Sequence, residues 1–478
     1  MKKITLLFSF LLFLGLGTSK AQYTVLHNFD DTGKNGNANG ANPRNNDLIL
    51  SGNVLYGMTT FGGANDSGCI FSINTDGSGY KDLHDFNNAS GAIPSGDLTI
   101  SGNVMYGMTA IGGVHNGGAI FSINTNGSGF AKLYDFNFTD TTGGGPGGSL
   151  VLSGNRLYGM TYGGGPASNG TVFSINTNGT GYSNMYDFTG EPDGFEPTGS
   201  LTLSGSTLYG MTSSGGKYDD GCIFTINTGG GGYSLLHSFN DTLGGVPNGS
   251  LILSGSTLYG MTQFGGVSSI GVIFSMNTGG SGYSDIFNFN GTNGDGPLGS
   301  LGLCRSTLCG MTYSGGSVDL GNIFSISTNG NNVNNLYNFN AGTTGILPTG
   351  SLTLSVTGDT LYGMATNGGA NNVGVIFRFI DGSLGINNLT TSTGSINVYP
   401  NPSNGMFHIV CHSERSEESQ PQMKVYNVLG EQVLTETLRS SQGDNTVDIT
   451  NQPNGVYLYR VIDNIGELIG NGKLIIQK

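Results

Sequence analysis

The sequence is poor in charged residues, and poorest in basic ones. Charged residues make up 10% of its 478 positions, with 17 Lys and Arg against 31 Asp and Glu, so the formal net charge is −14. Without residues 1–21, which hold Lys2, Lys3 and Lys20, the balance is 14 basic against 31 acidic residues, or −17. So acidic a surface repels phosphate, which argues against nucleic acids and anionic membranes as partners.

Motifs for chemistry are also missing. The sequence has no Gly-x-Ser-x-Gly nucleophile elbow and no metalloprotease motif, and the spacing of its five cysteines fits no zinc site. Its Asn-Gly turns lack the acidic residues of a calcium loop, and its Gly-rich loops lack the helix that a phosphate cradle needs. We therefore expect no catalytic motif, no metal site and no cofactor.

After residue 21 no stretch is apolar and long enough to span a membrane. Before it, Lys2 and Lys3 precede an apolar run from Ile4 to Leu16, and Ser19-Lys20-Ala21 is a small-x-small cleavage site. This pattern is typical of a secretory signal peptide, here residues 1–21. No cysteine follows the cleavage site, which argues against a lipoprotein.

Glycine is abundant, with 86 residues, and it belongs to a repeat. Leu55-Tyr56-Gly57-Met58 recurs six times with small changes, and the glycines at 57, 107, 159, 210, 260, 310 and 363 are 50, 52, 51, 50, 50 and 53 residues apart. Aromatic residues keep fixed places in this repeat, which disordered low-complexity chains do not show. A period of about 51 residues indicates a repeat architecture.

Each repeat predicts four short antiparallel strands. In the second repeat these are 97–100, 104–109, 119–123 and 130–136, and Gly102 stands where a tight hairpin turn needs a positive φ. The apolar runs are nearly continuous, as in residues 69–73, so both faces of each sheet should be buried. Four-stranded sheets packed face to face are the blades of a β-propeller.

The two ends of the array suggest a ring. Six third strands are followed by a fourth strand, but the seventh, around Ile376 and Phe377, is not, and a matching segment stands at 23–29. Pairing of these two segments would close the ring and hide its open edges. We predict an all-β fold: a seven-bladed β-propeller over residues 22–381, closed by an N-terminal strand.

Leu-Tyr-Gly-Met-Thr, followed by Gly-Gly and by Gly-x-Ile-Phe-Ser-Ile-Asn, resembles the GloVer-type tandem repeat of bacterial exported proteins. The resemblance covers roughly residues 22–381. It implies a surface or secreted β-propeller, and it supplies no activity and no catalytic residues.

Residues 382–395 read as a linker, and 396–478 as a second domain. Motifs such as 397–402, 425–431 and 454–461 are very similar to the C-terminal sorting domain of type IX (Por) secretion cargo. This resemblance implies a small Ig-like β-sandwich that engages the type IX machinery. It places the protein outside the cell, secreted or on the outer-membrane surface of a Gram-negative bacterium. A polar run at 412–419 departs from the family and reads as an exposed loop.

Cysteines and histidines have structural interpretations. Cys69 and Cys222 share one repeat position with small apolar residues, which indicates buried side chains. Cys304 and Cys309 flank a hairpin turn and could form a disulfide, which an unknown strand register leaves open. His27, His84 and His237 align with tyrosines, as packed rings would. Acidic and amide residues at the equivalent ends of the fourth strands, among them Asp85, suit hydrogen bonding there.

The repeats differ most in their second-to-third loops. This variation has two explanations: neutral drift of solvent-exposed loops, or a binding site, since loops on a rigid scaffold are where binding sites usually lie. Tyrosine rings stack on sugars and amides bridge their hydroxyls, so glycans are a suitable ligand class. The candidate ligand-binding residues are Asn65, Asp66, His115, Asn116, Lys217, Tyr218, Asp219, Asp220, Asp319 and Asn371.

Our leading hypothesis is a monomeric, non-catalytic binding or adhesion module for a glycan or protein ligand. The alternative is a polysaccharide-active propeller enzyme, a hydrolase or lyase, which would need two carboxylates from different blades. Glu191, Glu196, Asp219 and Asp220 are the places to look. A third possibility is a structural surface protein.

Overall fold

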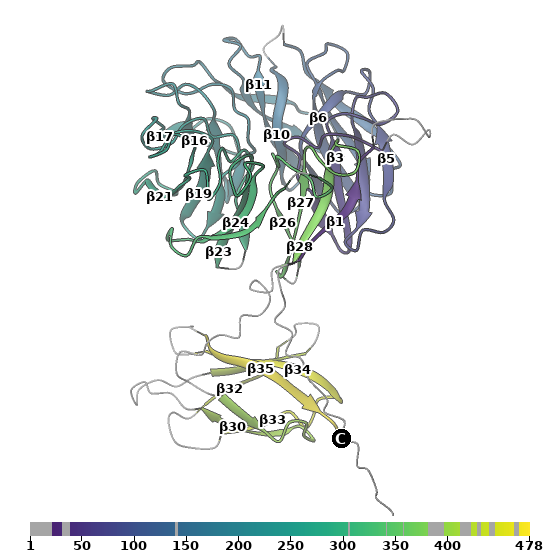
Figure 1. Cartoon of the computed structure of the whole chain (residues 1–478), viewed down its shortest axis with the longest axis vertical. Coiled ribbons are helices and arrows are strands. Elements are labelled where there is room, and N and C mark those ends of the chain that lie inside the picture. The colour runs from purple at the N-terminus through teal and green to yellow at the C-terminus, as the bar shows by residue number, and fades with distance from the viewer. Residues whose placement is uncertain are drawn as a thin grey trace, which may run out of the picture. The chain divides into compact units, whose positions relative to one another are not determined.

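The computed structural model describes residues 22–30, 39–138, 142–304, 306–340, 342–356, 358–380, 396–411, 422–427, 432–438, 445–462 and 468–478. The chain divides into two compact units, Met1–Gly385 and Ile386–Lys478. The predicted signal peptide, the linker 382–395 and the polar run 412–419 lie outside the described residues. Every regular element within the described ranges is a strand, so the chain is all-β (Figure 1).

The first unit contains seven four-stranded antiparallel sheets, one for each repeat. The first strands are β2 (Ile49–Ser51), β6 (Ala92–Ser101), β10 (Gly144–Ser153), β14 (Thr202–Ser204), β18 (Ile252–Ser254), β22 (Gly302–Cys304) and β26 (Thr353–Leu354). The second strands are β3 (Val54–Thr59), β7 (Val104–Ile111), β11 (Arg156–Gly163), β15 (Thr207–Thr212), β19 (Thr257–Thr262), β23 (Thr307–Thr312) and β27 (Thr360–Ala365).

The third strands are β4 (Cys69–Asn74), β8 (Ala119–Asn124), β12 (Thr171–Asn176), β16 (Cys222–Asn227), β20 (Val272–Asn277), β24 (Asn322–Ser327) and β28 (Val375–Ile380). The fourth strands are β5 (Lys81–Asp85), β9 (Ala131–Asp135), β13 (Ser183–Asp187), β17 (Ser234–Ser238), β21 (Ser284–Asn288), β25 (Asn334–Asn338) and, at the start of the chain, β1 (Gln22–Asn28).

The glycine of the Leu-Tyr-Gly-Met motif is required by packing. Gly57 pairs across the sheet with Phe71, and a Cβ on Gly57 would stand 2.5 Å from the Phe71 ring. The same close approach, 2.4–2.7 Å, recurs in all seven repeats. Any side chain at this position would displace a fully buried phenylalanine, which explains why the repeat carries glycine inside a strand.

The segment 23–29 makes the expected pairing. β1 runs antiparallel to β28, with Gln22 opposite Ile380 and Asn28 opposite Val375, and it supplies the fourth strand of the sheet that holds β26, β27 and β28. The first and last residues of the repeat array therefore share one sheet.

Seven buried clusters lie between neighbouring sheets, each drawn from two consecutive repeats. One of them joins the ends of the array: Phe29, Tyr362 and Met364 of the seventh sheet pack with Leu55 and Phe71 of the first. Each of the seven sheets therefore has a packed neighbour on both faces, as the nearly continuous apolar strands predicted.

The histidines are packed rings, as expected. His27, His84 and His237 stack on an aromatic ring of the next repeat at a centroid distance of 3.8 Å. Tyr134 and Tyr186 do the same at 4.0 and 3.9 Å. Burial lowers the pKa of His27 and His237 to about 4 and also lowers the pKa of His84. These side chains stabilise the joints between sheets.

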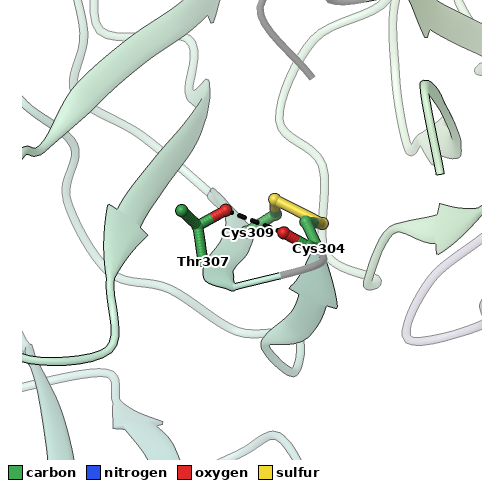
Figure 2. Close-up of a disulfide and its surroundings, with 3 residues drawn as sticks. All are labelled: Cys304, Thr307 and Cys309. Carbon is green, nitrogen blue, oxygen red and sulfur yellow. Dashed lines mark hydrogen bonds between the residues drawn. A yellow bond between two sulfur atoms is a disulfide. The ribbon is translucent and has the colours of Figure 1, made fainter. Parts of the chain in front are cut away.

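The cysteines divide into two kinds. Cys69 and Cys222 are buried, unpaired, and lie beside Thr59 and Thr212 in the sheet interior. Cys304 and Cys309 form a disulfide, shown in Figure 2, with their Cα atoms 5.9 Å apart. Cys304 pairs with Thr307 across the hairpin, so Cys309, two residues further on, points to the same face.

The second unit holds two sheets around a common core. β29 (Ile396–Tyr399), β30 (Met406–Cys411) and β33 (Asn445–Asp448) form one sheet. β31 (Gln422–Tyr426), β32 (Gln432–Thr437), β34 (Gly455–Ile462) and β35 (Leu468–Ile476) form the other. Phe407 of the first sheet and Val425 of the second are fully buried in the same cluster. Two sheets sharing one core form a small β-sandwich.

Candidate ligand-binding face

The second-to-third loops and the fourth-to-first loops of the seven repeats lie at the same end of their sheets. We call this end the variable-loop face. The backbone of each second-to-third loop is anchored by the end of its fourth strand: Ala64 N–H donates to Asp85 Oδ1, Val114 N–H to Asp135 Oδ1, both at 2.9 Å. Asn288, Asn338 and Asn28 accept the equivalent bonds in later repeats. The predicted hydrogen-bonding role of these strand-end residues is confirmed.

Four of the predicted site residues close their own loops. Asp66, Asn116, Asp219 and Asp319 occupy one repeat position with φ of 52–64°. Their side-chain oxygens accept a hydrogen bond from the backbone N–H of the first loop glycine at 2.8–3.1 Å. Asp and Asn tolerate this backbone conformation and make such local bonds. Loop geometry alone accounts for these four residues.

Two more predicted residues are tied to the sheet. The side-chain amides of Asn65 and Asn371 donate to the carbonyls of Phe86 and Phe29, at 2.9 and 2.7 Å. Phe86 and Phe29 occupy equivalent positions just after β5 and β1. These amides therefore fix where the loop crosses the end of its sheet.

The remaining four predicted residues present side chains for contact. His115, Lys217 and Tyr218 are exposed, and Lys217 Nζ lies 4.9 Å from the centre of the Tyr218 ring. Asp220 is half-buried, and burial followed by the charge of Asp241 raises its pKa. The fourth repeat thus combines an aromatic ring, a cation and a carboxyl group.

Apolar side chains gather on this face. Of the twelve large apolar side chains exposed among the described residues of the repeat unit, nine belong to the variable-loop face, and three, Leu235, Leu303 and Val356, do not. The nine are Val114, Phe138, Tyr162, Tyr218, Leu243, Phe264, Val267, Tyr313 and Val318. These nine residues are distributed over the second to sixth repeats, so this face exposes most of the large apolar surface side chains of the repeat unit.

A cavity of about 410 Å³ lies beside the first strands of all seven sheets. Each of six repeats lines it with three successive residues, such as Ser95, Gly96 and Asp97 in the second, and the first repeat contributes Asn45 and Asp47. Its remaining lining comes from the second and third repeats at the variable-loop face, including Ile111, Phe138 and Tyr162. The cavity therefore has a mouth on that face.

A cycle of hydrogen bonds surrounds this cavity. The backbone N–H of Asp47 donates to Asp97 Oδ1 at 2.6 Å, and that of Asp97 donates to Ser149 Oγ at 2.7 Å. Equivalent bonds of 2.7–2.8 Å link the next serines in turn, and the Ser351 N–H donates back to Asp47 Oδ1. We call the seven residues the belt: Asp47, Asp97, Ser149, Ser200, Ser250, Ser300 and Ser351.

Two carboxyl groups meet in the belt. Burial, followed by the charge of Asp47, raises the pKa of Asp97 well above its usual value, and burial also raises the pKa of Asp47. The pair therefore retains a proton at a pH where exposed aspartates have lost theirs. Asp47 and Asp97 stand at a position where the other five repeats have serine. Their side chains accept the same backbone N–H bond as those serines do, so their first role is to link neighbouring repeats.

The mouth is bordered by the third repeat and by the loops that join it to the second and fourth repeats. Across the last pair of β10 and β11, Gly144 faces Gly163, and the Phe138 ring lies against both; a Cβ on Gly144 would stand 2.5 Å from it. Glu196 of the fourth repeat lies next to Tyr162, since a hydrogen bond between their side chains contributes to the raised pKa of Tyr162, after burial. An aromatic pair and a carboxyl group thus border the opening.

Sequence reasoning missed the belt and this mouth. The belt has a visible signal, a Gly-Ser-Leu or Gly-Asp-Leu triplet in six repeats, which we interpreted only as the start of a strand. Phe138 also had a signal in the sequence: it lies in the longest loop of the 52-residue repeat. The strand that follows this loop begins with two glycines, Gly144 and Gly145.

Among the described residues, no group of three or more His, Cys, Asp or Glu is placed to hold a metal ion. Nor do these residues include a helix of the length and apolarity needed to cross a membrane.

The comparisons with known proteins identify both parts of the chain. The Gloeobacter/Verrucomicrobia repeat matches residues 14–219 and 204–404. This chain belongs to that repeat family. Residues 397–477 match the secretion system C-terminal sorting domain, which indicates export by type IX secretion to the cell surface or extracellular space. No curated protein matches the chain.

Two solved structures are distant likenesses. The extracellular domain of a one-component system from B. thetaiotaomicron is 12% identical, with a TM-score of 0.45 over 89% of this chain. The chain spans 56% of that structure's length. The β-propeller domain of the Trilobed protease from Pyrococcus furiosus is 10% identical, with a TM-score of 0.44 over 70% of this chain and 94% of that one.

Proposed function

We propose that the repeat unit is a closed seven-bladed β-propeller that binds glycans on its variable-loop face without cleaving them. In this proposal, type IX secretion delivers it to the cell surface or the medium, where it acts as a monomeric binding or adhesion module. The observation that carries the proposal is the distribution of exposed apolar side chains, nine of twelve on one face.

Chemistry favours a glycan as the ligand. The face combines exposed aromatic rings with carboxyl, amide and hydroxyl groups, and sugars need both an apolar platform and polar partners. The negative net charge of the chain, −14, disfavours polyphosphates as ligands. The closed ring of blades is supported by the β1–β28 pairing, by the cluster between the last and first sheets, and by the belt.

The test is a polysaccharide and glycan panel with the mature chain 22–478, scoring retention and release of new reducing ends together. Retention without new ends is the expected result. Release of reducing ends would instead support a polysaccharide-degrading enzyme, for which Glu196 at the mouth is the first candidate for one of two carboxylates. The absence of both retention and release would contradict glycan binding.

Matched substitutions locate the binding surface. Phe264→Ser removes an exposed ring at a position where Ser214 and Ser314 stand in other repeats, so the fold should tolerate it, and retention should fall. Leu235→Asn is the control, because Leu235 is also exposed but lies in β17, where Asn184 and Asn335 are its equivalents. Equal loss in both variants would argue against the variable-loop face.

A further inference from the structure

The third repeat differs from the others around the cavity. Gly147 is the only glycine at a lining position where the other repeats carry Asn45, Ser95, Thr198, Asn248, Leu298 and Thr349. Gly145 and Gly163 leave further space at the same side of the mouth. The third repeat therefore contributes the smallest residue to this part of the lining, on the side of the cavity where Phe138 and Tyr162 lie.

The rim offers a surface for stacking. Phe138 and Tyr162 both line the cavity, and their side chains are 44% and 43% exposed. The Phe138 ring packs against two glycines: a Cβ added to Gly145 would stand 3.1 Å from the ring, and one added to Gly163 would stand 3.4 Å from it. Aromatic rings exposed in this way suit the apolar face of a pyranose.

The floor offers hydrogen bonds of both kinds. Each belt residue uses one side-chain oxygen to accept a backbone N–H from the preceding repeat. The side chains of Ser149 and Ser351 also form hydrogen bonds with the carboxyl groups of Asp97 and Asp47, which bond to each other. The hydroxyl hydrogens of Ser200, Ser250 and Ser300 take no part in the bonds of the belt. The belt can therefore both donate to and accept from the hydroxyl groups of a sugar.

We infer that the belt cavity receives the terminal sugar residue of a glycan, which enters past Phe138 and Tyr162 and forms hydrogen bonds with the hydroxyl groups of the belt. This rests on the proposed function and narrows it from a face to one subsite. The volume of about 410 Å³ suits a small ligand group. Because seven repeats surround the cavity, a linear chain enters it only by an end, so recognition depends on the terminal residue.

The test uses the mature chain on an array of oligosaccharides attached through their reducing ends, presenting terminal glucose, galactose, mannose, fucose or N-acetylglucosamine. Binding to each retained glycan is then competed with the free methyl glycoside of its terminal sugar. Gly147→Leu places in the cavity lining the residue that Leu298 supplies in the sixth repeat. Because a Cβ on Gly147 would stand 3.2 Å from the Thr198 carbonyl oxygen, the fold of this variant is checked first by its thermal transition. Leu235→Asn is the control: Leu235 is exposed in β17, away from the variable-loop face, and Asn184 is its equivalent in another repeat.

The expected result is competition by the methyl glycoside, at least about tenfold weaker binding by Gly147→Leu, and binding by Leu235→Asn within about twofold of the original chain. Should Gly147→Leu not fold, Phe138→Ala, which removes an exposed ring, should weaken binding similarly. Full binding by Gly147→Leu, or by Phe138→Ala in its place, would overturn the subsite and leave glycan binding by the face standing. An array on which the original chain binds nothing would overturn both.

Discussion

At the belt position the seven repeats use only two residue types, whereas at one position of the variable loops they use almost as many types as there are repeats. The belt has serine five times and aspartate twice. The second position of the loops has Asn65, His115, Ala167, Tyr218, Ser268, Val318 and Asn371. The two regions belong to the same seven repeats.

The difference reflects where side chains make the links between repeats. In the belt, the side chain itself accepts the hydrogen bond from the neighbouring repeat, so only a short residue with an oxygen fits. In the loops, the backbone is held by the strand end and by one loop residue, such as Asp85 and Asp66. At the second loop position only Asn65 and Asn371 add a side-chain bond to the sheet. The other residues at this position, such as His115 and Tyr218, make no such link and can change without loss of the fold.

The largest effect should come from removing the strand that joins the two ends. Deletion of 23–29 removes nearly all of β1 and the buried Phe29, and leaves β28 with an unpaired edge. We expect loss of the cooperative thermal transition and aggregation, measured by differential scanning calorimetry and size-exclusion chromatography. An unchanged Tm with monomeric elution would contradict the role of β1.

A smaller effect concerns the joints between sheets and depends on pH. The folded-state pKa of His27 and His237 is about 4, below the unfolded value of 6.5, so the unfolded chain binds more protons between these values. The histidines should therefore lower stability as the pH falls from 6.5 towards 4. Asp47 and Asp97, with raised pKa values, act in the opposite direction.

The comparison that isolates the histidines is a triple variant, His27→Phe, His84→Phe and His237→Phe, because Phe287 stands at the equivalent place in the fifth repeat. Its Tm should fall less than that of the original chain over this pH range, since the aspartate contribution is common to both. Parallel Tm profiles would show that the stacked histidines do not control the pH response.

The smallest effect should come from exchanging loops. Replacing residues 217–220, Lys-Tyr-Asp-Asp, by Val-His-Asn-Gly of the second repeat keeps the loop length and an amide at the hydrogen-bonding position. We expect a change in stability within about 0.5 kcal/mol, checked by urea unfolding. A loss of several kcal/mol in the free energy of unfolding would show that these loop side chains stabilise the fold, and would contradict the contrast drawn between loops and belt.

Much of the fold could be predicted from the sequence because each repeat makes the same local choices seven times. The period, the Gly102 turn and the unmatched strand at 23–29 were enough to predict four-stranded sheets and the β1–β28 pairing. The disulfide was left open because it depends on register, which the pairing of Cys304 with Thr307 decides.

The candidate site was harder to predict because variability alone does not separate a contact residue from a loop-forming one. Asp66 and Asn116 vary in type yet make the same bond to their own loop. Phe138 and Tyr162, by contrast, lie at the mouth of the cavity, where the third repeat carries three glycines (Gly145, Gly147 and Gly163). That arrangement depends on how seven repeats meet, which no single repeat shows.

A closed ring requires the seven interfaces between sheets to be alike, including the one between the last sheet and the first. Phe29 and Phe86 occupy equivalent positions and are both fully buried, Phe29 at that interface and Phe86 at the next. Denaturant unfolding of Phe29→Ala and Phe86→Ala compares them directly. We expect each to lose about 3–5 kcal/mol, as for a phenylalanine removed from a packed core. A loss below about 1 kcal/mol for Phe29→Ala, beside a full loss for Phe86→Ala, would contradict a closed ring.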